Sequence, residues 1–218
     1  MNLPIRMNLK LNLAFIFLFV SGLFACAPKE PKIQLQSGDL LFREETSGKL
    51  SEAIDQVTQT SGKTHFSHVG LAEVTDTGIM VLHAYPKDGT CIVSLQEFLH
   101  PKGESVRIIA YRLKDEWQKA IPEAIRKAHK MLGKPYNFSY ILSDSAYYCS
   151  DFIYRAFDAD SIFKLEPMTF KDPATGKFPA AWAEYYQKMN IEIPEGKPGC
   201  NPNGLAASEK LERLGKIE

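Results

Sequence analysis

Ala146-Tyr-Tyr-Cys-Ser-Asp-Phe-Ile-Tyr-Arg-Ala-Phe157 is the stretch of sequence on which we expect the fold to centre. Its apolar and small residues follow the i, i+3, i+4, i+7 spacing of a helix with one buried face: Cys149, Phe152, Ile153 and Ala156. The polar residues at 143–145 favour a helix start just upstream, so Cys149 falls in the first turn. Unpaired backbone N–H groups and the helix dipole favour a thiolate there, which predicts a lowered pKa for this thiol. Cys149 is therefore a candidate nucleophile. The alternative is a small hydrophobic side chain that packs the helix face.

Two consecutive strand-like segments carry the histidines that such a nucleophile would need. The segments 65–74 and 79–85 flank Asp76-Thr77-Gly78, which is a strong hairpin signal. A turn centred between the first two of these residues places His68 and His83 on the same face of the hairpin. They are then diagonal neighbours, about 7–8 Å apart at the backbone.

These residues predict a relay of three side chains. A cysteine nucleophile needs a base that takes its proton and returns it to the leaving group, and the pKa of histidine suits both steps. We expect Cys149 to attack, His68 to act as base and acid, and His83 to orient His68. One alternative is a pair of half-buried strand histidines without a catalytic role. Another is a metal site of His65, His68, His83 and Cys149, which no tight Cys/His spacing supports, so we expect neither metal nor cofactor.

Five short blocks of the sequence resemble, in order, the successive blocks of the YiiX/YebB-like family. The blocks are Gly38-Asp-Leu-Leu-Phe42, Phe66-Ser-His-Val-Gly-Leu71, Val81-Leu-His-Ala84, Gly133-Lys-Pro-Tyr136 and Tyr148-Cys-Ser-Asp151. Members of that family are circularly permuted papain-like enzymes of the NlpC superfamily, in which the histidine-bearing strands precede the cysteine-bearing helix. The resemblance covers residues 38–190 and implies a papain-like α+β domain with cysteine hydrolase or amidase activity. By position it assigns the nucleophile to Cys149 and the base to His68.

The third position of the relay departs from the pattern of many YiiX-type relatives. They carry a carboxylate there, in a Glu-Ala pair, whereas this chain has His83-Ala84. A histidine in this place is similar to what the lecithin retinol acyltransferase branch and many unpermuted NlpC enzymes use. A neutral imidazole stabilises an imidazolium less than a carboxylate does. We therefore expect His83 to contribute less to turnover than Cys149 or His68.

The oxyanion that develops during acyl transfer needs fixed hydrogen-bond donors. The backbone N–H of Cys149 is the first candidate, because it lies at the start of a helix. Tyr136 and Tyr148 are weaker candidates for a second, side-chain donor. The sequence does not choose between them, and Tyr147 and Tyr148 could equally be packing residues, a role we favour for one of the two.

Strand-like segments cluster early in the chain and helical segments cluster late. This order predicts an α+β fold with a mostly antiparallel sheet packed against helices. Beyond the elements above, we expect strands at 38–42, 91–93 and 106–113, a capping box at Ser94–Glu97, and helices at 50–61, 121–133 and 180–189. The remaining segment, 191–218, has the pattern of a tail with a short helix at 206–214.

The first residues have the pattern of an export signal. Arg6 and Lys10 precede an apolar run at 11–24 that is too short to span a bilayer comfortably. The run ends in Leu23-Phe-Ala-Cys26, which resembles the lipobox of bacterial lipoproteins. The resemblance implies cleavage before Cys26 and acylation of that residue, and the alternative is an ordinary signal peptide. We therefore expect a lipoprotein signal peptide (1–25), a lipid-anchored tether (26–37), a hydrolase domain (38–190) and a tail (191–218), in the bacterial cell envelope.

The charge of the mature chain gives no reason to expect nucleic acid as a partner. The full chain carries 26 Lys and Arg residues and 26 Asp and Glu residues. Removal of residues 1–25 takes away two basic residues and no acidic one, which leaves a net charge of about −2. Two further cysteines, Cys91 and Cys200, could form a disulfide outside the cytoplasm, but the sequence does not show whether they meet.

Together these patterns predict a membrane-tethered cysteine hydrolase that cleaves an amide bond through an acyl-cysteine intermediate. A cell-wall peptide or peptidoglycan fragment is the substrate expected first, because NlpC relatives cleave such bonds. An acyl lipid is the second, which would make the protein a lipid or N-acyl hydrolase or an acyltransferase of the lecithin retinol acyltransferase type. A hypothesis of another class is a non-catalytic binding lipoprotein, although a binding module has no need of an intact set of Cys149, His68 and His83.

Overall fold

The computed structural model describes residues 33–44, 49–60, 64–103 and 106–217. The predicted signal peptide and its acylation site, Cys26, lie outside the described residues and stay predictions. Residues 32–218 form one compact unit.

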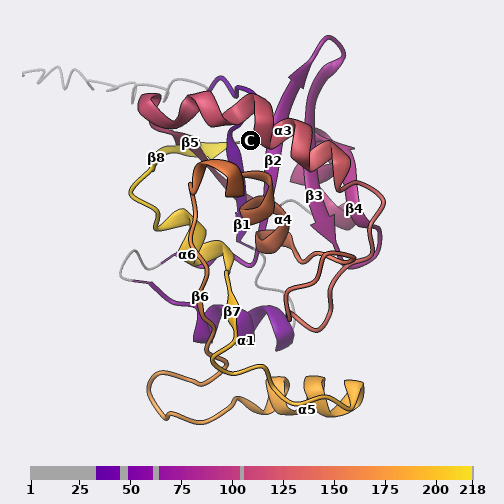
Figure 1. Cartoon of the computed structure of the whole chain (residues 1–218), viewed down its shortest axis with the longest axis vertical. Coiled ribbons are helices and arrows are strands. Elements are labelled where there is room, and N and C mark those ends of the chain that lie inside the picture. Colours follow the sequence, from indigo (N-terminus) through magenta and orange to yellow (C-terminus); the bar gives the residue numbers. More distant parts are fainter. Residues whose placement is uncertain (1–32, 45–48, 61–63, 104–105, 218) are drawn as a thin grey trace, which may run out of the picture. The chain divides into compact units, whose positions relative to one another are not determined.

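A six-stranded antiparallel sheet is the centre of this unit (Figure 1). Its order is β4-β3-β2-β1-β5-β8, and each neighbouring pair runs antiparallel. The strands are β1 (Leu40–Glu44), β2 (His68–Thr75), β3 (Gly78–Tyr85), β4 (Gly89–Ser94), β5 (Arg107–Leu113) and β8 (Leu211–Ile217). A separate two-stranded ladder joins β6 (Glu166–Pro167) to β7 (Pro198–Gly199). The α+β class expected from the sequence is confirmed.

The hairpin of β2 and β3 has the predicted register. Leu71 pairs with Leu82 and Thr75 pairs with Gly78, so the turn is centred between Asp76 and Thr77. Pairing between β2 and β3 stops at Leu71 and Leu82. The start of β2, which carries His68, and the end of β3, which carries His83, extend beyond these paired residues.

Helices pack on both faces of the sheet, because successive side chains of each strand point to opposite faces. In Figure 1, α3 (Ile121–Lys130) and α4 (Cys149–Ala156) lie in front of the sheet. With the strands they bury a core that contains Leu40, Phe42, Val69, Leu71, Ile109, Ala124, Phe152 and Ile153. The other face packs against α2 (Leu95–Leu99) in a core that contains Leu41, Ala72, Val81, Phe98, Leu99 and Ile108.

Local sequence signals place several helix starts where they were expected. Ser94 and Glu97 form the predicted capping box at the start of α2, with each side chain bonded to the other's backbone N–H. α3 begins at Ile121 with Pro122 in its first turn, where the missing N–H costs nothing. The remaining helices are α1 (Lys49–Val57), α5 (Ala180–Met189) and α6 (Pro202–Ala206), with 3₁₀ turns η1 (Pro101–Gly103), η2 (Asp115–Ala120) and η3 (Asp158–Asp160).

The C-terminal segment is part of the domain, which corrects the expected tail. The short helix expected at 206–214 is wrong: α6 ends at Ala206, and 211–217 forms β8 along β5. Leu211 and Ile217 are buried, so the segment gains both hydrogen bonds and apolar contacts in the sheet. The described part of the expected tether also packs on the domain, because Leu35 is buried and the carbonyl of Gln34 accepts a hydrogen bond from Arg112 Nη2 at 3.0 Å.

Candidate active site

Cys149 is the first residue of α4, as the sequence predicted. Tyr148 precedes it with extended backbone angles (φ −94°, ψ 168°), and its carbonyl accepts the first helical bond, from Phe152 N at 2.9 Å. The polar residues upstream do not cap this helix, contrary to expectation. Asp144 instead pairs with Arg155 in the last turn, at 2.7 Å. The first N–H groups of α4 are therefore left free of a side-chain cap, and they point toward the region around the thiol.

The two strand histidines form a direct pair. His68 Nε2 lies 2.8 Å from His83 Nδ1, and both residues are buried, with 5% and 4% of their surfaces exposed. The diagonal placement deduced from the hairpin is thus confirmed. The rings of Phe98 and Tyr85 lie against the pair, with centroids 5.3–5.7 Å from the histidine rings. These rings hold the imidazoles in place and keep water away from them.

The sulfur of Cys149 lies against the backbone of β2 at Val69, the residue after His68. Cys149 belongs to the core on the α4 side of the sheet, whereas the two histidines share the face of Phe98. The backbone N–H of Val69, the residue after His68, lies close enough to the thiol to hydrogen-bond it. This position is at the end of β2 where pairing with β3 has stopped. The thiol and the imidazoles therefore lie on opposite faces of the sheet at this end of β2, and the contacts of the described residues include none between Cys149 and either histidine.

Burial decides the charge state of the thiol. Desolvation raises the pKa of Cys149 to about 11, although the backbone N–H groups of Ser150 and Val69 and the charge of Arg43 act in the opposite direction. The lowered pKa expected from the helix start is therefore wrong. The helix terminus does favour the thiolate, but the cost of burying a charge is larger.

Both histidines are neutral in this environment. Burial, then Arg43, then His83 lower the pKa of His68 well below 6.5, and burial and Arg43 lower the pKa of His83 to about 3. At rest the site therefore holds a neutral thiol and two neutral imidazoles, rather than a thiolate and an imidazolium.

Arg43 is a site residue that the sequence analysis missed. It lies on β1 directly opposite His68 in the strand register, and 1% of its surface is exposed. Its guanidinium carbon is 5.6 Å from the centre of the Tyr85 ring and 5.1 Å from that of Phe98. An arginine directly after the apolar run Leu-Leu-Phe, in a strand with a buried core, is the signal that would have found it.

The two tyrosines expected as possible oxyanion donors, Tyr148 and Tyr136, have different hydrogen-bond partners. The Tyr148 hydroxyl accepts a hydrogen bond from the backbone N of Cys200 at 3.3 Å and lies 4.0 Å from the sulfur of Cys200. Tyr136 instead lies near Cys149 and hydrogen-bonds to Tyr140, and burial raises the pKa of both these hydroxyls well above 10. Tyr136 is therefore the better placed of the two with respect to the sulfur.

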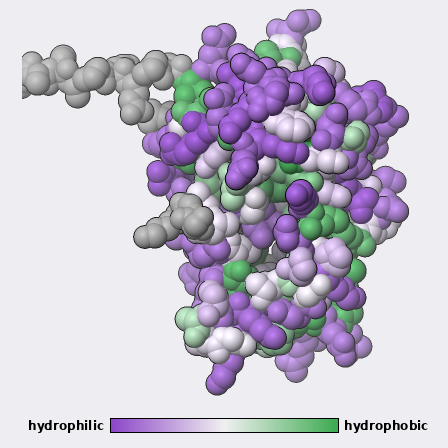
Figure 2. Space-filling model, turned by 60° about the vertical axis from the view of Figure 1, so that its left-hand side comes forward, coloured by the Kyte–Doolittle hydropathy of each residue, from purple (hydrophilic) through white to green (hydrophobic). Residues whose placement is uncertain are grey.

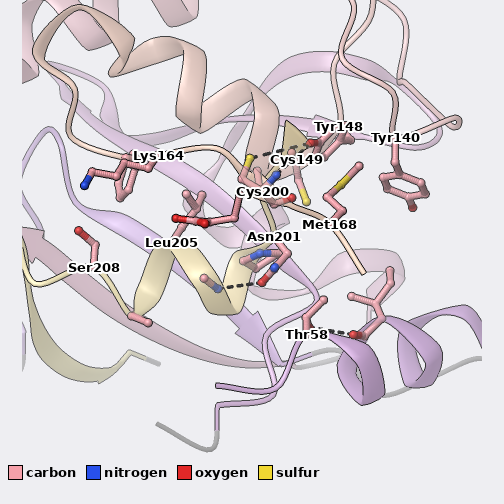
Figure 3. A pocket seen from close by; sticks show the side chains of 18 of the residues that line it. Thr58, Tyr140, Tyr148, Cys149, Lys164, Met168, Cys200, Asn201, Leu205 and Ser208 are labelled. Atoms are coloured by element: carbon pink, nitrogen blue, oxygen red, sulfur yellow. Dashed lines mark hydrogen bonds between the residues drawn. The ribbon is translucent and has the colours of Figure 1, made fainter. Parts of the chain in front are cut away.

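Cys149, the candidate nucleophile, lines a cavity of about 690 Å³. In Figure 3, Lys164 and Ser208 lie at one end of it, Tyr140 and Met168 lie at the other, and Cys149 lies between them on the side of Tyr140. Figure 2 shows a face of the molecule that is hollowed, with hydrophobic and weakly polar side chains around the hollow. The thiol is thus buried in the protein but faces a space large enough for an organic substrate.

The remaining candidates from the sequence lie elsewhere. His65 Nδ1 pairs with Asp55 at 2.8 Å on the surface, whereas His68 and His83 are buried. Among the described residues, no group of three or more His, Cys, Asp or Glu side chains is arranged to hold a metal ion. Cys91 and Cys200 are both free thiols and form no disulfide with each other. Within the same described ranges, no helix is long and apolar enough to cross a membrane.

Comparisons with known proteins show the fold and the family of the chain. A crystal structure described as that of the metalloprotein yiiX from Escherichia coli O157:H7 superposes with a TM-score of 0.64 at 22% identity. The alignment covers 84% of this chain and 97% of the E. coli chain, which establishes a common fold. No curated protein sequence matches the chain. The model of the permuted papain-like amidases of the YaeF/YiiX type matches residues 34–215. The chain therefore belongs to the YaeF/YiiX family, C92, of permuted papain-like amidases.

Proposed function

We propose that the protein hydrolyses an amide bond through an acyl-cysteine formed on Cys149, with His68 as general base and acid and His83 as its positioning residue. The observation that carries this proposal is the 2.8 Å contact between His68 and His83, next to a thiol that approaches the N–H of Val69. Further support is that both groups lie at the same end of β2, the thiol on the α4 side of the sheet and the histidine pair on the side of Phe98.

The contact is compatible with the tautomer that the proposed chemistry needs. His68 Nε2 faces His83 Nδ1, so Nδ1 of His68 is the nitrogen left to take the thiol proton. It is unprotonated only if Nε2 of His68 carries the hydrogen and donates it to His83 Nδ1. His83 then carries its own hydrogen on Nε2, an atom that is buried and has no hydrogen-bond partner among the described groups. In this tautomer, His83 accepts a hydrogen bond that strengthens when His68 becomes protonated.

The reaction then needs no preformed ion pair. As Sγ of Cys149 bonds to the carbonyl carbon, its proton passes to His68, which later gives it to the leaving amine when the C–N bond breaks. Water hydrolyses the thioester in the second half, with His68 again as the base. The N–H groups at the start of α4 and the hydroxyl of Tyr136 are the proposed donors to the oxyanion.

We place this activity in the bacterial cell envelope, on a membrane to which Cys26 would be anchored by lipid. The support is the apolar run and lipobox-like end of residues 11–26. Cell-wall peptides and acyl lipids are the two substrate classes such a location offers. A non-catalytic binding lipoprotein is less consistent with a buried thiol and histidine pair, because burial of these polar groups costs stability without serving binding.

Mass spectrometry with a short activated acyl amide tests the mechanism. The wild-type chain is expected to release the amine and to carry a transient acyl group on Cys149. Cys149→Ala and His68→Ala are expected to lose both signals. His129→Ala is the matched control, because His129 is an exposed histidine paired with Glu73 at 2.8 Å. Amine release that survives in Cys149→Ala would overturn the proposed function.

A further inference from the structure

Asn203 is a fully buried residue of α6 that has no part in the proposed relay. Its side-chain oxygen accepts hydrogen bonds from Phe66 N at 2.9 Å and from the hydroxyl of Thr64 at 2.9 Å. Its side-chain nitrogen donates to the carbonyl of Phe66 at 3.2 Å and to the hydroxyl of Thr58 at 2.8 Å. A buried amide is costly without such partners, and a network in which each polar atom is bonded fixes one orientation. Asn203 therefore holds Phe66 in a defined position.

Phe66 lies on the path of the chain to the proposed base. It precedes His68 by two residues and lies before the start of β2. Because the amide of Asn203 bonds both the N–H and the C=O of Phe66, it takes the place that a neighbouring strand would have. The next residue, Ser67, donates its N–H to the carbonyl of Arg43 on β1 at 3.0 Å. The approach to His68 is therefore fixed from two sides, by α6 and by β1.

The chain just before α6 bonds to both neighbours of Cys149. Cys200 N donates to the hydroxyl of Tyr148 at 3.3 Å, and the hydroxyl of Ser150 donates to the carbonyl of Cys200 at 3.0 Å. Figure 3 shows the contact between Cys200 and Tyr148 beside Cys149. The first turn of α4 is therefore attached to the same stretch of chain as the approach to the base.

The chain between these two attachment points has one defined shape. Asn201 caps α6, because its side-chain oxygen accepts a hydrogen bond from Gly204 N at 2.8 Å. Pro202 follows at the first position of the helix, where its fixed φ suits a helix start. We name residues 200–203 the connecting segment, since one end bonds to the neighbours of the proposed nucleophile and the other end to the chain before the proposed base.

The connecting segment supplies directional contacts that the packing of α4 on β2 lacks. Val69, Phe152 and Ile153 belong to the apolar core on the α4 side of the sheet. Apolar contacts are non-directional, so they resist a small shift of the helix along the strand less than hydrogen bonds do. The described contacts include none between Cys149 and either histidine, so their spacing depends on the elements that carry them.

We propose that Asn203 is a positioning residue for the reaction, and that the connecting segment sets the spacing between His68 and Cys149. This inference rests on the proposed function and adds to it a residue that touches neither the substrate nor the reacting atoms. Asn203 acts through Phe66 on His68 and does not line the cavity. A misplacement of about 1 Å can lower a rate about 100-fold, so such a residue affects turnover more than substrate binding.

Asn203→Leu tests this role, because leucine has a similar volume and no hydrogen-bonding group. The full chain is assayed with p-nitrophenyl acetate at pH 7. We expect kcat to fall on the order of ten- to hundred-fold and KM to stay within about twofold. Ile217→Ala is the matched control, because Ile217 is buried in β8 and its truncation is expected to lower the melting temperature while keeping kcat. Both variants are assayed below their measured melting temperatures.

A double-mutant cycle with His68→Ala separates positioning from a general structural effect. The measured quantity is the rate at which p-nitrophenyl acetate transfers its acetyl group to Cys149 with release of p-nitrophenol, followed by mass spectrometry. Asn203→Leu should slow this step in the wild-type background, but should change it by less than about twofold once residue 68 is alanine. An equal fold-loss in both backgrounds would overturn the positioning role, because the effect would not act through His68.

Ser150→Ala is a second variant, at the other end of the connecting segment. It removes only the hydroxyl that donates to the carbonyl of Cys200. We therefore expect a smaller fall in kcat, about three- to tenfold, which also disappears in the His68→Ala background. This variant decides the question if Asn203→Leu does not fold, and an unchanged kcat in Ser150→Ala would then overturn the inference.

Failure of this inference and failure of the proposed function give different results. A folded Asn203→Leu chain with kcat within about twofold of wild type overturns the positioning role and leaves the proposed function intact. A loss of kcat in Ile217→Ala as large as that in Asn203→Leu does the same, because the loss would then follow stability. Wild-type rates equal to those of Cys149→Ala overturn the proposed function, and this inference with it.

Discussion

At the scale of single residues, the candidate site depends on the balance between a helix terminus and burial. The first turn of α4 offers N–H groups to the sulfur of Cys149, but desolvation is the larger effect and raises the pKa of the thiol to about 11. Arg43 adds a buried positive charge that opposes protonation of His68 and His83. The thiol and the two imidazoles are therefore neutral at rest, and their charges develop only during the reaction.

This balance predicts how alkylation of the thiol depends on pH. Because the pKa of Cys149 lies above the usual thiol value, its thiolate fraction rises about tenfold for each pH unit up to pH 10. Iodoacetamide labelling should therefore increase steadily from pH 6 to pH 10. Peptide mapping resolves Cys149 from Cys91, whose pKa burial also raises to about 11. A plateau below pH 8 at Cys149 would contradict the neutral pair and indicate a thiolate–imidazolium pair.

The relay predicts an unequal loss of activity among its members. Cys149→Ala and His68→Ala should lower kcat/KM at least about 100-fold, since each removes a group that makes or breaks bonds. His83→Ala should cost about tenfold, and His83→Gln should restore part of the loss, because an amide oxygen can accept the His68 hydrogen bond. The measurement is kcat/KM across pH for all four variants. An equal loss in His83→Ala and His68→Ala would show that His83 does more than position.

At the scale of elements, the loop that carries Tyr136 is docked on the start of β4. Thr90 N donates to the carbonyl of Lys134 at 2.8 Å, and Gly133 N donates to the carbonyl of Thr90 at 2.8 Å. Gly89 has φ +68°, and a Cβ added there would lie 2.2 Å from the carbonyl oxygen of Lys134. This close approach of two backbones has no room for a side chain.

Gly89→Ala should therefore destabilise the protein and disturb the site. The left-handed backbone costs about 1–2 kcal/mol for a residue with a side chain, and the contact with Lys134 adds to that cost. Gly78→Ala is the matched control, because Gly78 also has a positive φ (+133°) but its added Cβ meets nothing within 4 Å. Denaturant unfolding and KM are the measurements. If the two variants lose equal stability and keep the same KM, the docking of this loop does not matter.

At the scale of the whole molecule, the C-terminal segment completes the sheet. β8 covers the outer edge of β5, and its buried ends, Leu211 and Ile217, join the cores on opposite faces of the sheet. An uncovered β5 would present a row of unpaired backbone groups to other chains.

Shortening this segment should therefore unfold or aggregate the protein, rather than trim a tail. Ile217→Ala is expected to cost about 2 kcal/mol, from lost burial and the space left behind. Glu212→Ala, at an exposed position of the same strand, is expected to stay within about 0.5 kcal/mol. Thermal and urea unfolding measure both. A chain ending at residue 208 that melts like the full chain would contradict this role of β8.

The sequence by itself determined the features that depend on short stretches of chain. The spacing in 146–157 is sufficient to place Cys149 at a helix start, and the turn at 76–78 sets the register that pairs His68 with His83. Both follow from contacts between residues close together in the chain. The tertiary structure alone decided the neutral state of the thiol, the burial of Arg43, the pairing of β8 and the cavity beside Cys149. These depend on which distant segments cover a group and exclude water from it, and desolvation is a property of the whole packed environment that no local pattern contains.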